Sequence, residues 1–118
     1  MKIEINPVPK VRMVRSDAWK QRKCVLDYWA FKDELRLKSR GLVIDDRFKI
    51  TFYMPMPKSW PKKKQAEMIG KPHQQRPDLD NLVKAFQDCL LKEDSQIWHI
   101  EAKKIWSDKG AIEVENMG

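Results

Sequence analysis

The sequence lacks the features that would place the chain in a membrane, outside the cell or among zinc proteins. No apolar run approaches the ~18 residues needed to span a bilayer, and the opening stretch MKIEINPVPK lacks the apolar segment of a secretory signal peptide. We therefore expect a cytoplasmic protein without a membrane partner. Cys24 and Cys89 lie far apart with no CxxC spacing, which predicts free thiols. His73 and His99 are the only histidines, and neither has another ligand at the spacing of a zinc site.

Long repeats and low-complexity tracts are also missing, and proline and glycine separate the expected elements instead of forming a linker. A chain of 118 residues has room for one hydrophobic core, so we expect a single domain over residues 1–118. Hydrophobic residues make up 42% of the chain, including five Trp and four Phe, which excludes a chain that is disordered throughout.

Positive charge is abundant and unevenly placed. The chain has 24 Lys and Arg against 17 Asp and Glu, which leaves a net charge of +7. The excess gathers in residues 1–25 and 57–76, both of which precede an acidic motif. Two interpretations stay open, a solvated surface and a binding surface for a polyanion such as DNA. The candidates for contacts with DNA phosphates are Arg12, Arg15, Lys62, Lys63 and Arg76.

Hydrophobic periodicity predicts two principal helices. Apolar residues recur at steps of three and four over residues 16–39, and Gly41 supplies a stop. A second apolar stripe predicts a helix over residues 80–92. A shorter basic helix is expected between Ser59 and Gly70.

Alternation of apolar and polar residues predicts the strands. The clearest lies at residues 48–54 and ends at Pro55. Residues 1–6 form a candidate edge strand, and residues 98–114 read as a closing hairpin around the turn SDKG. The predicted fold is therefore α+β, a small mixed sheet packed by two principal helices in a single compact domain.

Two carboxylates stand one residue apart in the stretch RPDLDNLVKAFQDCL, residues 76–90. Asp80 is placed to cap a helix that begins at Asn81, which would explain that residue alone. Asp78 follows Pro77 in an extended approach, where alternate residues point the same way, so both carboxylates can aim at one point. Mg²⁺ prefers such oxygen ligands, and the sequence leaves the cap and the metal site as alternatives.

Further charged residues follow the pair. Lys84 lies four residues after Asp80, which suits either an i,i+4 ion pair or a cation that supports charge on a scissile phosphate. Asp88 lies one turn further, and a chain returning to the sheet could bring Asp94 beside Asp78 and Asp80.

The stretch RPDLDNLVKAFQDCLLKEDSQI closely resembles the signature of the RusA family of Holliday-junction resolvases, which phages and prophages often carry. The shared parts are Asp-x-Asp-Asn-Leu, a lysine four residues after the second Asp, an apolar helix and an acidic pair before the next strand. The resemblance is strongest over residues 76–97. The link KSWPKKKQAEMIGKPHQQ is longer than in the best-known member and looks like a variant of phage-type relatives.

The resemblance implies roles for particular residues. Asp78, Asp80 and Asp94 look like the family's catalytic carboxylates and would hold Mg²⁺ or Mn²⁺, while Lys84 looks like its catalytic lysine. Glu93 is a weaker acidic candidate. Asp88 is then better interpreted as a surface or helix-pairing residue.

The resemblance also implies an activity and partners. It indicates a homodimeric endodeoxyribonuclease that resolves four-way DNA junctions by metal-dependent paired cuts in recombination and repair, with no small-molecule substrate. The competing hypotheses are a non-catalytic basic DNA-binding module, in which the Asp residues only cap and pair, and a structural protein with solubilising basic faces.

Overall fold

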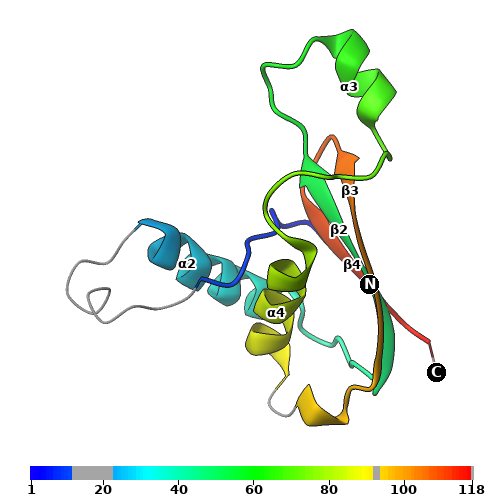
Figure 1. Ribbon diagram of the computed structural model, residues 1–118. Helices are drawn as coiled ribbons and strands as arrows, with labels where there is room; N and C mark the ends of the chain where they lie inside the picture. Colours follow the sequence, from blue (N-terminus) through cyan, green and yellow to red (C-terminus); the bar gives the residue numbers. More distant parts are fainter. Residues whose placement is uncertain (12–22, 92–93, 118) are drawn as a thin grey trace.

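The computed structural model describes residues 1–11, 23–91 and 94–117. In chain order the elements are β1 (Lys2–Ile3), α2 (Lys23–Lys38), β2 (Arg47–Pro55), α3 (Lys62–Met68), α4 (Leu79–Leu90), the 3-10 turn η1 (Asp94–Gln96), β3 (His99–Ser107) and β4 (Ala111–Asn116) (Figure 1). The predicted α+β class, with a small mixed sheet and two principal helices, is confirmed. The predicted first helix is described from Lys23 onward, and its earlier part lies outside the described residues.

The sheet has the order β1-β4-β2-β3, with β2 paired in parallel to β3 and antiparallel to β4. The predicted terminal hairpin is therefore wrong. A short turn joins β3 to β4, but the two strands lie on opposite sides of β2. The reason is burial: Phe48, Ile50 and Phe52 of β2 are almost fully inaccessible, so the most apolar strand takes the centre of the sheet.

The hydrophobic core lies between the sheet and the two helices α2 and α4, which cover the same face (Figure 1). Phe86 of α4 packs on Phe48 of β2 with ring centroids 5.9 Å apart. The buried face of α2 consists of Val25, Tyr28, Phe31 and Leu35. Both predicted helical stripes thus form the core, except for Trp29 of the first stripe, which is 42% exposed.

A polar contact joins the two helices at the rim of this core. The Tyr28 hydroxyl donates to Asp88 Oδ2 at 2.7 Å, and Lys32 Nζ donates to the same oxygen at 3.1 Å. These hydrogen bonds hold the pKa of Asp88 below its usual range, the one from Tyr28 having the larger effect, while burial raises the pKa of Tyr28. Asp88 is therefore a helix-pairing residue, as interpreted from the sequence.

Cys24 and Cys89 are free thiols, as predicted. Burial raises the pKa of the Cys89 thiol, which packs in the core beside α2. Within the described parts of the chain, none of the helices has the length and apolar character required to cross a membrane.

Candidate active site

The segment leading into α4 is attached to the outer edge of β3. The Gly70 N–H donates to the Trp106 carbonyl at 2.8 Å, and the Trp106 N–H donates to the Lys71 carbonyl at 2.9 Å. Three residues after Gly70, the His73 N–H donates to the Lys104 carbonyl at 3.0 Å. The approach to the acidic motif therefore follows β3 as an additional, irregular edge.

Lys104 fixes the last part of this approach. Lys104 pairs in register with the buried Phe52, so its side chain leaves the sheet on the face covered by the helices. Its ammonium donates to the carbonyl of Gln75 and, at 2.5 Å, to that of Pro77. The backbone immediately before Asp78 is thus held by a cation from a neighbouring strand.

The sequence contained a signal for this lysine that was missed. Ile100, Ala102 and Trp106 share the helix-facing side of β3 with Lys104, because side chains alternate along a strand. A lysine at an otherwise apolar position indicates a polar partner on that face. Only the tertiary structure identifies the partner as the turn before α4.

Asp78, and not Asp80, occupies the N-cap position of α4, because the helix begins at Leu79. The predicted cap at Asp80 is wrong by two residues. Asp78 has extended dihedral angles, and its backbone carbonyl accepts the first helical hydrogen bond, from Leu82 at 3.3 Å. Its side chain makes no capping hydrogen bond, so capping does not account for this exposed carboxylate.

Asp80 lies in the first turn of α4 and forms an ion pair with Lys84, with Nζ 3.5 Å from Oδ2. Their side chains are 67% and 58% exposed, and an exposed i,i+4 pair contributes only about 0.3–0.5 kcal/mol. Leu79, between the two aspartates, packs against the core, as predicted. The carboxylates of Asp78 and Asp80 therefore remain accessible on the surface at the start of the helix.

The backbone of Asp94 lies in η1, beyond the opposite end of α4 (Figure 1). The helix has 12 residues, and a rise of about 1.5 Å per residue separates its ends by about 18 Å. The backbone of Asp94 therefore lies at the other end of α4 from Asp78 and Asp80. Among the residues that the structure describes, no group of three potential metal ligands is found. Glu93 lies outside these residues.

The predicted phosphate-binding residues are only partly described. Arg12 and Arg15 lie outside the described residues. Lys62 and Lys63 are exposed on α3, and Arg76 is exposed in the approach to Asp78. A further basic residue that the sequence did not single out is Lys10, whose backbone N–H donates to the Asn81 carbonyl at 3.0 Å. The backbone of Lys10 therefore lies beside the start of α4, while its ammonium lies 3.9 Å from Asp88 Oδ1, further along the helix.

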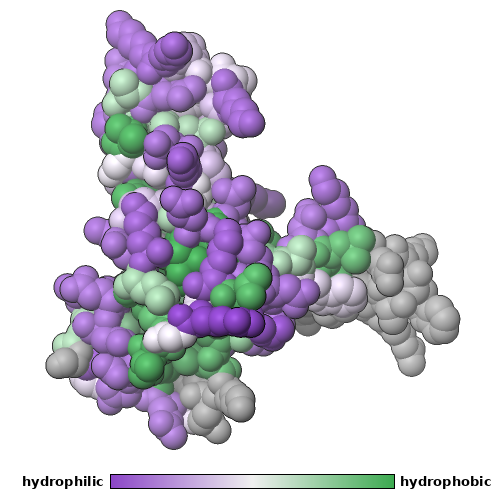
Figure 2. Space-filling view, turned by 180° about the vertical axis from the view of Figure 1, so that it is seen from behind, coloured by the Kyte–Doolittle hydropathy of each residue, from purple (hydrophilic) through white to green (hydrophobic). Residues whose placement is uncertain are grey.

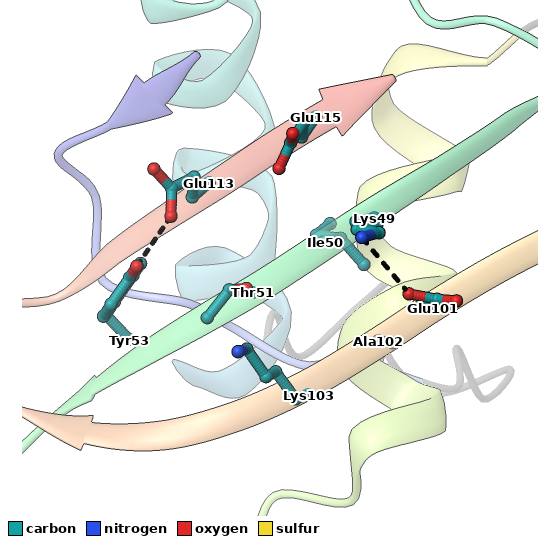
Figure 3. A pocket seen from close by; sticks show the side chains of 9 residues that line it. All are labelled: Lys49, Ile50, Thr51, Tyr53, Glu101, Ala102, Lys103, Glu113 and Glu115. Atoms are coloured by element: carbon teal, nitrogen blue, oxygen red, sulfur yellow. Dashed lines mark hydrogen bonds and ion pairs between the residues drawn. The ribbon is translucent and has the colours of Figure 1, made fainter. Parts of the chain in front are cut away.

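A shallow hollow lies on the opposite face of the sheet, away from both helices (Figure 3). Its charges are of both signs: Lys49 lies 3.8 Å from Glu101, the Tyr53 hydroxyl donates to Glu113 at 2.7 Å, and Lys103 and Glu115 also line the hollow. The mixture of signs makes this face a poor surface for a polyanion. Asp78 and Asp80 instead lie at the start of α4, on the helix-covered side of the sheet, and the lysines of α3 lie beyond the end of the sheet (Figure 1).

Comparison with known proteins identifies relatives of this chain. The phage r1t of Lactococcus has a crossover junction endodeoxyribonuclease rusA that is 51% identical over 45 residues, covering 34% of this chain and 34% of the phage protein. The uncharacterized protein YqaN of Bacillus subtilis (strain 168) is 36% identical over 73 residues, covering 55% of this chain and 51% of that protein.

These matches thus span between a third and about half of the two relatives. No solved structure matches the chain significantly. The family described as endodeoxyribonuclease RusA matches residues 5–116, which include every described element from α2 to β4. The chain belongs to the endodeoxyribonuclease RusA family.

Proposed function

We propose that this protein is a structure-selective endodeoxyribonuclease that resolves Holliday junctions by metal-dependent paired cleavage in DNA recombination and repair. One observation carries the proposal within the family: the exposed Asp78 carboxylate at the start of α4 has no capping role. A carboxylate without a capping bond adds little to stability here, whereas metal-dependent phosphodiester hydrolysis uses such groups as metal ligands.

The residues at this site fit a hard divalent cation such as Mg²⁺ or Mn²⁺. Carboxylate oxygens are its preferred ligands, and the exposure of Asp78 and Asp80 leaves room for the waters that Mg²⁺ retains. Asp78, Asp80 and Asp94 would hold the ion, which when bound supplies an activated water and stabilises charge on the phosphate oxygens. Lys84, 3.5 Å from Asp80, would place its ammonium beside the scissile phosphate and stabilise the developing charge.

The separation of about 18 Å along α4 supports a homodimer in which two chains complete each site. Asp78 and Asp80 would come from one chain and Asp94 from a second copy. A twofold axis would then create two equivalent sites, which suits a junction with two nearly symmetric strands to cut. The basic residues around the start of α4 would neutralise the phosphates next to each cut.

The first experiment tests the chemistry. A synthetic four-way junction is incubated with the protein, with and without Mg²⁺, beside the variants Asp78→Asn and Asp80→Asn. We expect paired, metal-dependent nicks from the wild type only, with binding preserved in the variants. Salt-sensitive binding by the wild type without any cleavage would instead support a non-catalytic DNA-binding module.

A mixing experiment tests the shared site. Asp78→Asn and Asp94→Asn are each expected to be inactive alone. In a heterodimer of the two, one shared site has both native aspartates and the other has neither, so the mixture should nick single strands without producing paired cuts. If each chain formed its own site, both sites in the heterodimer would lack one aspartate and the mixture would stay inactive.

A further inference from the structure

A basic arm, residues 57–71, projects beyond the end of the sheet between β2 and the approach to α4 (Figure 1). Its helix α3, which the structure describes in full, has no buried residue. Hydrophilic side chains cover most of this projecting part of the molecule (Figure 2). The arm therefore adds little to the core, and its composition reflects some other requirement.

The base of the arm is nevertheless firmly attached. Trp60 packs on Trp106 of β3 with ring centroids 4.8 Å apart, and His73 packs on the same indole at 4.2 Å. Trp106 and His73 are both 5% exposed. Burial lowers the pKa of His73, so the imidazole is neutral and adds no charge to this aromatic base.

Backbone geometry closes the arm at its second end. Gly70 has a φ of +80°, a conformation that other residues rarely adopt, and the turn it forms brings the chain back to β3. The hydrogen bonds between Trp106 and the backbone of residues 70–71 complete the attachment. An anchored helix presents its side chains in a fixed direction, which a purely solubilising loop does not require.

The charge of the arm identifies the partner. Residues 57–71 contain five lysines and a single glutamate, Glu67. Lys64 lies over the Trp60 ring at 4.3 Å, while Lys62 and Lys63 are exposed at the start of α3. This mostly positive surface contrasts with the mixed charges on the open face of the sheet. A row of lysines on a rigid support matches the phosphates of a DNA backbone.

We propose that the basic arm is a second DNA-contacting surface, which grips the duplex arm of a junction several base pairs away from the cut. The inference rests on the proposed function and extends it. Lys104 holds Pro77, and the Met56 N–H, just before the arm, donates to the carbonyl of Ser107. Ser107 lies three residues beyond Lys104 along β3, which is about 10 Å at roughly 3.3 Å per residue. At about 3.4 Å per base pair, α3 would meet phosphates three or more base pairs from the scissile bond.

The test is the triple variant Lys62→Gln, Lys63→Gln, Lys64→Gln. Junction binding is measured by fluorescence anisotropy without divalent cations, over a range of salt concentrations. Loss of three phosphate contacts should lower the slope of log Kd against log salt by about 2–3. Thermal unfolding should change little, because α3 has no buried side chain and the variant loses only the contact of Lys64 with the Trp60 ring.

A matched control removes the same charge from the open face of the sheet. Its three substitutions, all lysine to glutamine, are at Lys2, Lys49 and Lys103. This variant should keep the salt slope of the wild type within about one unit. An equal reduction in both triple variants would mean that net charge alone is responsible and would overturn the proposal.

A second measurement locates the contact on the DNA. Neutral methylphosphonates replace the phosphates three to six nucleotides from the branch on each strand. The wild type should lose affinity, whereas the α3 variant should be insensitive because its contact is already lost. If the losses of affinity from the α3 variant and from the methylphosphonates were additive, the proposal would be overturned. An unchanged salt slope in the α3 variant, combined with an altered oligomeric state, would also overturn it, because the arm would then be a protein contact. Because these assays measure binding alone, they stand whether or not the protein cleaves DNA.

Discussion

Replacing Lys104 with methionine should loosen the turn that places Asp78. The ammonium of Lys104 donates to the carbonyls of Gln75 and Pro77, and methionine preserves most of the apolar stem but neither hydrogen bond. The adjacent core residue Phe52 would keep its packing. The substitution therefore removes a polar connection between β3 and the approach to α4 while changing little else.

The expected cost follows from these two contacts. A hydrogen bond from a charged group contributes about 1.5–3 kcal/mol when it is buried, and less when water competes. One of the two bonds is exposed and the other is partly buried, so we expect a combined loss of about 2 kcal/mol. For a domain of this size, that loss corresponds to a fall in Tm of roughly 8 °C.

Thermal and urea unfolding measure this loss, with Lys103→Met as the control. Lys103 is the neighbouring residue on β3, but its side chain lies on the open face of the sheet (Figure 3). The control should change stability by less than about 0.5 kcal/mol. Equal stability of the Lys103 and Lys104 variants would refute the reasoning. If the proposed function holds, Lys104→Met should also need more Mg²⁺ for half-maximal cleavage, because Asp78 would be less well positioned.

Two further predictions concern the fold. The hydrogen bond from Tyr28 lowers the pKa of Asp88 below its ordinary value of 3.8. The ionised Asp88 carboxylate therefore stabilises the fold fully above pH 3.8, and this stabilisation is lost as the pH falls through the pKa of Asp88 in the folded protein. Tyr28→Phe should cost about 1 kcal/mol near neutral pH and weaken the acid dependence of urea unfolding, and an unchanged dependence would contradict this. Gly110→Ala should cost about 1–3 kcal/mol, because the new Cβ would lie 2.8 Å from the Asn6 Cα, which belongs to the backbone and cannot rotate away. Thermal unfolding should show a smaller loss for Gly41→Ala, which is strained at φ +86° but meets no atom within 4 Å.

The sequence predicted the local structure well where an element has a clear period. The stripe from Leu79 to Phe86 specified both the helix α4 and its buried face. The same period placed Leu79 toward the core between two outward carboxylates, and the structure confirms that arrangement. These features depend on residues within a few positions of one another, so local patterns suffice.

The order of the strands did not follow from local patterns. The turn between β3 and β4 resembles a hairpin turn, yet β2 separates the two strands. Strand pairing is decided by competition for the centre of the sheet, and the burial of Phe48 and Phe52 favours β2 there. A periodic pattern identifies a strand and its apolar side but does not identify its neighbours.

By itself, the sequence determined the α+β class, the two core helices and an accessible acidic pair with a lysine one turn away. Only the tertiary structure decided how these parts meet. It ties the turn before Asp78 to Lys104 and places the backbone of Asp94 beyond the far end of α4, a rigid helix of 12 residues that is about 18 Å long. It also attaches the basic arm to Trp106, since contacts between distant segments arise only when the chain packs.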